Sequence, residues 1–204
     1  MHLPRVKAGE ICRENNMYVI KSKGLFILGM LFLLLTSFGN EPKTEKKVFP
    51  KPEKTKSLLF YVQRTFNTNT LVYELNTDDK GNINLTEPIK IHWVNYATNG
   101  SSEGLNYIQR KYAYGLEAKL TDADKKSFVF NFVSYKKKQL YLIKSTLDNH
   151  YDAFIEINKK LVILNSVFIQ IEGGSFWVPK IKYIEIKGKD ITKGGEEITE
   201  RIIP

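Results

Sequence analysis

The sequence predicts an all-β domain, a β-sandwich of about eight or nine mostly antiparallel strands with one short helix. From residue 57 onward, short apolar or alternating runs are separated by clusters of Asn, Asp, Gly and Lys. Phe128, Phe130 and Phe132 alternate with smaller residues, and Ile89, Ile91 and Trp93 alternate with Lys90, His92 and Val94. This period of two is typical of half-buried strands, and a sandwich is favoured over a closed barrel.

Nine strands and one helix are expected in chain order. The expected strands cover residues 57–66, 70–76, 89–96, 112–120, 127–135, 139–145, 151–157, 160–172 and 180–187. The turns between them include Lys80-Gly81-Asn82 and Gly173-Gly174, where a tight reversal favours glycine. Ser102 is expected to cap a helix over 103–111, with Leu105, Ile108 and Tyr112 on its inner face.

The apolar run 25–38 predicts an export signal. It follows Lys21 and Lys23, precedes the small residue Gly39, and is shorter than the roughly 20 residues that span a bilayer. We therefore expect an exported protein, periplasmic or associated with the cell envelope. An uncleaved signal anchor is the alternative.

The chain divides into three parts on this interpretation. Residues 1–39 hold an N-terminal extension and the signal, whose translation start is expected at Met17. Residues 40–56, rich in Lys, Glu and Pro, predict a flexible tether, and 57–204 a single domain. The one cysteine, Cys12, precedes the signal, so disulfides and thiolate metal sites are not expected in the mature chain.

The charge of the mature chain is moderately basic. From residue 40 onward there are 26 Lys and Arg against 20 Asp and Glu, a net charge of +6. An exported protein seldom meets nucleic acid, so no nucleic-acid partner is expected. A solvated surface is the simplest interpretation, and association with an anionic polysaccharide or the periphery of a membrane is the alternative.

Arg64 is the first candidate binding residue. Its strand position matches that of Phe60 and Val62, so it should point toward the apolar side, where a guanidinium needs a carboxylate, carbonyl groups or a bound anion. Arg110 follows in a similar short sequence, Tyr107 to Tyr112. A structural arginine at a strand end is the alternative for Arg64.

Asparagine and tyrosine side chains surround these arginines in the sequence. Asn67, Asn69, Tyr114 and Gly115 belong to this group, and their amides and aromatic rings suit recognition of sugars or peptides. Sheet packing explains the tyrosines equally well.

His92 and Trp93 complete the candidate set. His92 shares a face with Lys90, and we expect a histidine on the solvated face of the sheet, with a general base as the alternative. The loop 76–87 has the glycine and glutamate spacing of a calcium loop, but Lys80 occupies a ligand position, so a hairpin loop is expected. No catalytic motif, metal site or cofactor is predicted.

Several blocks together resemble a known family. They are Phe49-Pro50 with Pro52, residues 59–76, 88–96, 109–115 and 183–188, and the end Ile203-Pro204. These blocks are similar to the family called domain of unknown function 4833. The resemblance implies a small, exported, single-domain bacterial protein, and it implies no mechanism because that family has no established activity.

The expected function is a non-catalytic, exported binding module for a polar or anionic small molecule, glycan or envelope component. The proposed ligand site combines Arg64, Asn67, Asn69, His92, Trp93, Arg110, Tyr114 and Gly115. One alternative is a hydrolase of an envelope polymer with His92 as base. A second is a purely structural envelope protein.

Overall fold

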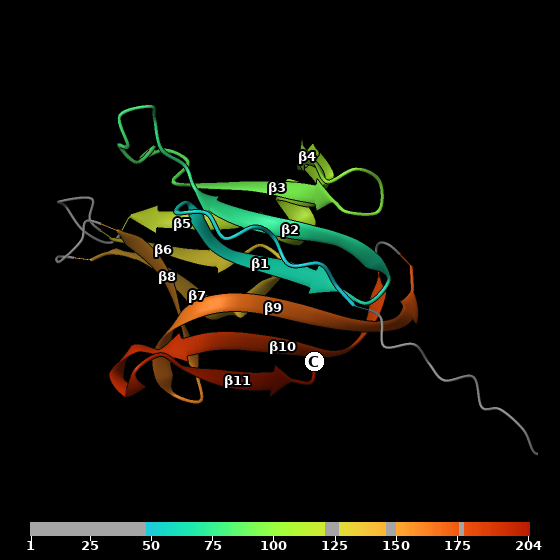
Figure 1. Ribbon diagram of the computed structural model, residues 1–204. Helices are drawn as coiled ribbons and strands as arrows, with labels where there is room; N and C mark the ends of the chain where they lie inside the picture. The colour runs from blue at the N-terminus through green and yellow to red at the C-terminus, as the bar shows by residue number, and fades with distance from the viewer. Residues whose placement is uncertain (1–47, 121–126, 146–149, 176–177) are drawn as a thin grey trace, which may run out of the picture. The chain divides into compact units, whose positions relative to one another are not determined.

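The computed structural model describes residues 48–120, 127–145, 150–175 and 178–204 (Figure 1). The predicted export signal and residues 40–47 of the predicted tether therefore lie outside the described part. No helix among the described residues has the length and apolar character needed to cross a membrane. Strands dominate the structure, which confirms the predicted β class.

The described residues form eleven strands that belong to one sheet. The strands are β1 (Leu58–Arg64), β2 (Asn67–Leu75), β3 (Ile89–Asn95), β4 (Ser101–Gly104), β5 (Leu116–Leu120), β6 (Ser127–Phe132), β7 (Tyr135–Lys144), β8 (Tyr151–Ile157), β9 (Lys160–Gly174), β10 (Pro179–Asp190) and β11 (Glu196–Ile202). Two short helical segments are η1 (Gln109–Tyr114), of π type, and η2 (Ile191–Lys193), of 3₁₀ type.

The long strand β9 organises the sheet. Its first residues pair with β8, with Ile163 opposite Phe154, and its middle pairs in parallel with β1, with Ser166 opposite Tyr61. Strand β10 runs antiparallel along the other edge of β9, and β11 pairs with β10. Strands β1 and β8 thus share one edge of β9. All pairs other than β1 with β9 are antiparallel.

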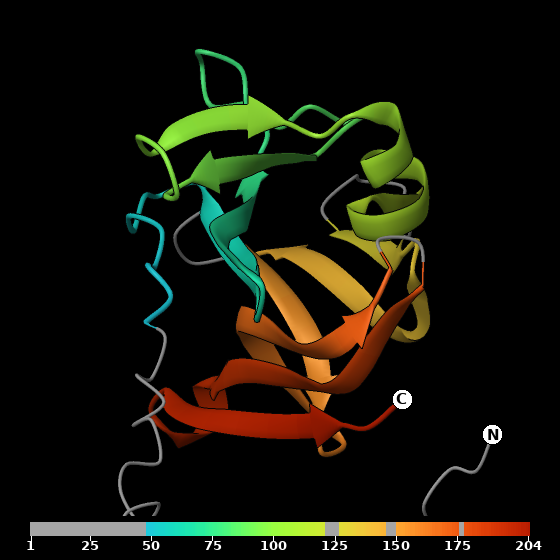
Figure 2. The same cartoon turned by 90° about the vertical axis from the view of Figure 1, so that its right-hand side faces the viewer.

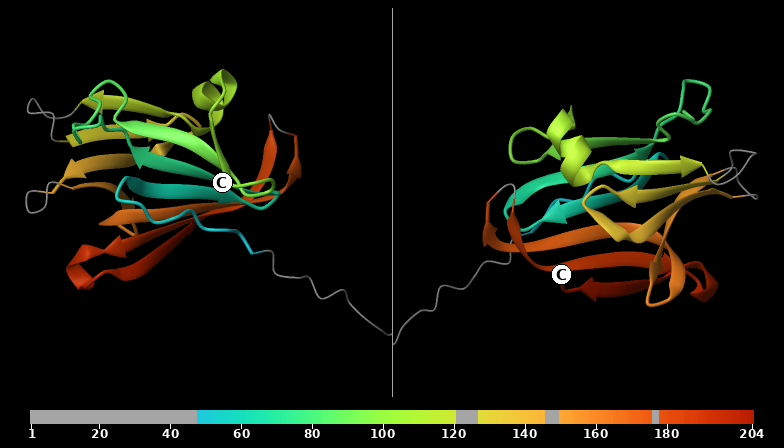
Figure 3. Two further views of the ribbon diagram at one scale, coloured as in Figure 1. Left: turned by 45° about the horizontal axis from the view of Figure 1, so that its top comes forward. Right: turned by 180° about the vertical axis from the view of Figure 1, so that it is seen from behind.

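The sheet consequently divides into two wings, which we call the first wing (β1–β4) and the second wing (β5–β8). The wings curl toward each other from β9, and η1 lies between them on the concave side (Figures 2 and 3). The result is a curled half-barrel. The expected sandwich of two sheets is corrected in this respect, because β9 keeps both wings hydrogen-bonded to one strand.

Aromatic and branched side chains from both wings fill the concave side. Phe60 of β1 stacks on Tyr73 of β2 with ring centroids 4.2 Å apart, and Phe132 of β6 meets both rings edge-on at 6.2 Å. Phe128 and Phe130 are buried, as their alternation predicts. The face that alternation marks as apolar is therefore the face that both wings turn inward.

The helix begins later than predicted. Residues 101–104 form strand β4, residues 107–108 form a helical turn that leads directly into η1, and Asn106, rather than Ser102, precedes this turn. The Asn106 side chain accepts a hydrogen bond from the Gln109 amide at 2.9 Å, and the Gln109 side chain accepts one from the Asn106 amide at 3.2 Å. This reciprocal pair satisfies two amides at the start of the helix. It also moves residues 112–114 from the predicted strand into η1.

Strand β11 is a further element that the sequence analysis missed. Ile198 and Ile202 pack against the core, but Glu200 stands between them and breaks the apolar alternation. Its carboxylate accepts hydrogen bonds from the Lys138 ammonium at 2.8 Å and from the Asn158 amide at 3.2 Å. A charge at this position is tolerated because it is paired.

The N-terminal strap, residues 48–56, is the described part of the predicted tether, and it lies on the outer face of the first wing (Figure 1). The Pro50 carbonyl accepts hydrogen bonds from the Gln63 amide group at 2.6 Å and the Thr70 hydroxyl at 3.1 Å. The Phe49 ring meets Phe168 edge-on, with centroids 5.2 Å apart. These contacts make the strap part of the domain, in agreement with a compact unit that begins at Val48.

Replacing Gln63 with alanine tests the role of this strap. The buried Gln63 amide joins Pro50 to Thr70, so its loss should lower the free energy of unfolding by about 1–3 kcal/mol. Urea denaturation followed by circular dichroism measures this change. The exposed Gln139→Ala change is the matched control and should have little effect. Equal midpoints for the two variants would contradict a stabilising strap.

Candidate functional site

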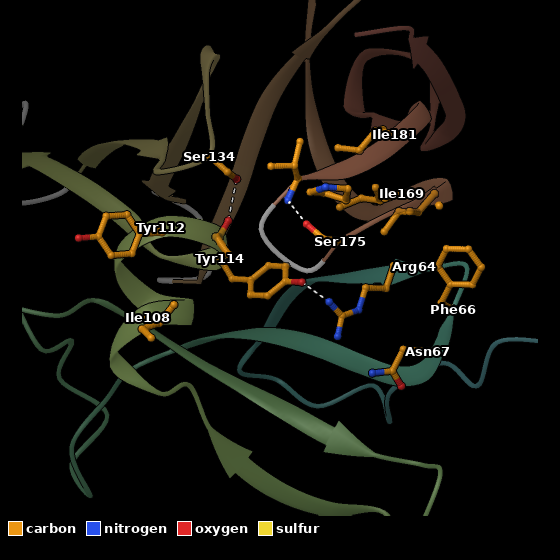
Figure 4. Close-up of a pocket in the computed structure, with 16 residues that line it drawn as sticks. Arg64, Phe66, Asn67, Ile108, Tyr112, Tyr114, Ser134, Ile169, Ser175 and Ile181 are labelled. Atoms are coloured by element: carbon orange, nitrogen blue, oxygen red, sulfur yellow. Dashed lines mark hydrogen bonds between the residues drawn. The ribbon is translucent and has the colours of Figure 1, made fainter.

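Arg64 lies at the end of β1 on the concave side of the first wing, as its strand position predicts. One of its terminal nitrogens, Nη1, donates a hydrogen bond to the Tyr114 hydroxyl (Figure 4). Its guanidinium carbon is 4.8 Å from the centroid of the Trp93 ring and 5.6 Å from that of Tyr114. The two rings meet edge-on, with centroids 5.3 Å apart. Arg64 is therefore held by aromatic faces and one neutral hydroxyl.

The charge of Arg64 has no carboxylate partner among the described residues. Its Nε atom is buried and makes no hydrogen bond in that part of the chain. A cation that is partly withdrawn from water without a counter-ion is costly, and a cation–π contact recovers only part of that cost. An anion bound beside Arg64 would supply the missing interaction.

A cleft of about 690 Å³ opens beside Arg64. It lies between the helix side, with Ile108 and Tyr112, and the β9–β10 side, with Ile169 and Ile181 (Figure 4). Arg64 is the only charged side chain among the described lining residues. The other polar side chains of the lining are the amide of Asn67 and the hydroxyl groups of Tyr112, Tyr114, Ser134 and Ser175.

Tyr114 is fixed by contacts to both wings. Its carbonyl accepts a hydrogen bond from the Tyr73 hydroxyl at 2.8 Å, and the neighbouring Ala113 carbonyl accepts one from the Ser134 hydroxyl at 2.6 Å. Burial raises the pKa of the Tyr114 phenol, although the nearby Arg64 charge acts in the opposite direction. Burial, with a smaller contribution from Tyr114, also raises the pKa of Tyr73. Both phenols stay neutral at physiological pH, so neither can serve as the counter-ion of Arg64.

Trp93, Asn67 and Tyr114 are the predicted site residues that the structure brings together with Arg64. Asn67 lines the cleft, and its side-chain oxygen accepts a hydrogen bond from the Asn69 amide at 2.8 Å. Trp93 is buried behind the guanidinium, and its indole nitrogen donates to the Gln109 side chain at 3.4 Å.

Asn69 and Arg110 have other partners. The Asn69 side chain donates to Asn95 at 2.9 Å and accepts from the Ala97 amide at 3.0 Å, which fixes the turn after β3. Arg110 forms an exposed ion pair with Glu87 and does not line the cleft. The two arginines that the sequence analysis combined in one site therefore have different surroundings. Arg64 lines the cleft, whereas Arg110 pairs with Glu87 in the loop before β3.

His92 lies on the outer face of the first wing, opposite Trp93. It is buried, contrary to the expected solvated position, and its Nδ1 atom is 3.9 Å from the Glu74 carboxylate. Burial lowers the pKa of His92, an effect that the Glu74 charge opposes and the Lys90 charge reinforces. His92 therefore faces away from the cleft.

Gly115 has a structural role in the path of the backbone at the end of η1. A side-chain carbon at this position would clash with the Arg110 carbonyl, because the chain leaves η1 against the helix itself. Its own carbonyl accepts a hydrogen bond from the Val133 amide at 3.1 Å, which links the end of η1 to the second wing. Gly115 therefore positions Tyr114.

The apolar walls of the cleft are the part of the site that the sequence analysis missed. They comprise Phe66, Ile108, Tyr112, Ile169, Ile171 and Ile181. A signal was present in β9, where apolar residues occupy both faces of an unusually long strand before Gly173-Gly174. Nothing in a single sequence, however, says that η1 stands opposite this strand.

The loop 76–87 joins the antiparallel strands β2 and β3, as the hairpin prediction requires. Asp78 accepts hydrogen bonds from the Asn82 side chain at 3.0 Å, the Asn82 backbone amide at 2.8 Å and the Lys80 backbone amide at 2.9 Å. These hydrogen bonds, led by that of the Asn82 side chain, lower the pKa of Asp78. In the described part of the chain, no group of three or more His, Cys, Asp or Glu side chains is arranged to hold a metal ion.

Comparison with known proteins gives one family. The profile of the family described as "Domain of unknown function (DUF4833)" matches residues 60–201, which cover most of the chain. Neither the curated proteins nor the solved structures contain a significant match.

Acid should destabilise the protein through His92. Burial holds the pKa of His92 below its ordinary value of 6.5, so the unfolded chain binds a proton where the folded protein does not. Stability should therefore fall as pH is lowered through 6.5. Chemical denaturation between about pH 8 and about pH 5 should show a smaller loss for His92→Gln than for wild type. His150→Gln, at a half-buried histidine of another wing, is the comparison variant, and equal slopes for all three proteins would contradict this account.

The Gly115→Ala change should weaken the fold and the site together. The clash with the Arg110 carbonyl should lower the free energy of unfolding by about 1–3 kcal/mol. Gly104→Ala is the matched control, since a methyl group there meets no atom within 4 Å. Thermal unfolding compares the two variants. A Gly115→Ala variant as stable as Gly104→Ala would show that the exit from η1 can shift freely.

Proposed function

This chain belongs to the DUF4833 family, and we propose that it is a non-catalytic binding module for a ligand that carries an anionic group. The observation that carries the proposal is the Arg64 guanidinium, which lines a cleft and has no carboxylate partner among the described residues. Arginine offers a planar set of donors that suits carboxylate and phosphate groups.

The surroundings of Arg64 support recognition of one anionic group. The Tyr114 hydroxyl and the Asn67 amide lie in the same cleft and can orient the ligand. The Trp93 and Tyr114 rings both contact the guanidinium and restrict its movement, so little side-chain freedom is lost on binding. A purely structural role would not require a cation in a cleft that lacks a carboxylate partner among the described residues.

The alternative of a hydrolase with His92 as base has less support. That mechanism requires His92 within hydrogen-bond reach of the ligand, and His92 lies on the opposite face of the sheet from Trp93. We place the module outside the cytoplasm, in the periplasm or at the cell envelope, on the strength of the apolar run 25–38 behind Lys21 and Lys23.

Replacement of Arg64 by glutamine tests this function. The purified protein is screened by thermal shift against envelope glycans, anionic lipids, peptides with free carboxylates and small inorganic anions. A ligand at 100 times its Kd should stabilise the folded state by about 2.7 kcal/mol, which for a domain of this size corresponds to roughly 5–10 °C.

The matched control is Arg110→Gln, because Arg110 pairs with Glu87 outside the cleft. Wild type and Arg110→Gln should show the shift, and Arg64→Gln should lose most of it. Equal shifts in both arginine variants, or no shift with any anionic class, would contradict an anion site at Arg64.

A further inference from the structure

The walls of the cleft are hydrocarbon over most of their extent. Ile169 of β9 and Ile181 of β10 form one side, and Ile108 and Tyr112 form the other (Figure 4). Ile171 of β9 also lines the cleft. Such walls cannot satisfy the many hydroxyl groups of a glycan. They suit a ligand whose bulk is apolar.

The rim of the cleft is apolar as well as exposed. Phe66 is 64% exposed, Tyr112 58% and Val178 75%, and all three line the cleft. Large apolar side chains that gather in the solvent around one concave site mark a surface that is covered when the protein functions. Scattered exposed residues would carry no such meaning.

The cleft adjoins a second, smaller hollow inside the half-barrel. This hollow has a volume of about 100 Å³ and shares Ala113, Tyr114, Ser134 and Ile169 with the cleft. Its other lining residues include the aliphatic Ile155, Ile184 and Ile186, three aromatic residues, and Lys138, whose ammonium is paired with Glu200. The apolar surface thus continues from the rim, past Arg64 and Tyr114, toward the core.

We propose that the ligand is an anionic amphiphile with a single hydrocarbon chain, such as a long-chain carboxylate. Its anionic head binds the Arg64 guanidinium beside the Tyr114 hydroxyl, and its chain lies along the isoleucine wall of β9 and β10. The proposal rests on the proposed function and adds the class of ligand. It accounts for the combination of a single charge, Arg64, with apolar walls in the described lining of the cleft.

A series of carboxylates of increasing length tests whether the hydrocarbon chain of the ligand contributes to binding. Isothermal titration calorimetry measures the Kd of hexanoate, octanoate, decanoate and dodecanoate for the full chain, below their micelle concentrations. Each methylene buried on the wall should tighten binding about fourfold, until the wall is filled. Dodecanol, which has the chain without the charge, should bind far more weakly than dodecanoate.

Two variants, one in the wall and one at the exposed rim, test the contribution of the apolar surface at two separate positions. Ile181→Glu places a carboxylate on the half-buried wall and should abolish the gain with chain length, and Phe66→Ser changes an exposed rim residue and should reduce it. Ile191→Glu is the matched control, because Ile191 is 57% exposed outside the cleft. The apolar run 25–38 is present in every variant, so differences between variants report on the cleft.

The outcomes separate this proposal from the broader one. Acetate or phosphate binding through Arg64 as tightly as dodecanoate would leave the anion site standing and overturn the amphiphile. Binding to phosphatidylglycerol vesicles without binding of dodecanoate would also overturn it, since it would indicate a membrane surface as the ligand. If no tested anion or amphiphile binds in a way that depends on Arg64, both proposals are overturned.

Discussion

The shared edge of β9 is the constraint from which the rest of the structure follows. One strand of fifteen residues pairs first with β8 and then with β1 along the same edge, while β10 covers the other edge. Because both wings start from one edge, they must diverge and curl, and their apolar faces meet over a common core. The helical segment η1 lies in the opening that remains between the wings (Figure 2), and the cleft is lined by residues of η1, β9 and β10.

The local features of this fold could be predicted from the sequence, and its long-range pairing could not. The alternation in Phe128–Phe132 and in Ile89–Trp93 marks the core face correctly, since period two reflects strand geometry alone. Strand β11 was not predicted because Glu200 interrupts its apolar alternation. This inward carboxylate is stabilised by Lys138, which is distant from it in the sequence. The helix start was missed at Asn106-x-x-Gln109, where the capping signal was present in the sequence.

The candidate site shows the same division. The position of Arg64 on the apolar side follows from its strand parity, and the structure confirms it. The partner of Arg64 does not follow from sequence, because Tyr114 comes from a helix held by Tyr73 and Ser134 of different wings. For His92, the alternation of the strand predicts the correct face of the sheet but not the burial of the side chain. Burial on that face depends on neighbouring segments that cover it.

The parallel pairing of β1 with β9 also sets an order for folding. Tyr61 and Ser166 are neighbours across the sheet, and the Thr65 amide donates to the Ile169 carbonyl at 3.2 Å, although about a hundred residues separate these segments in the chain. Contacts over such separations form slowly, since the intervening loop must close first. During synthesis, β1 therefore waits with one edge unpaired until residues near 169 emerge. For that interval the nascent first wing has an open strand edge, the kind of surface that favours aggregation until its partner strand pairs with it.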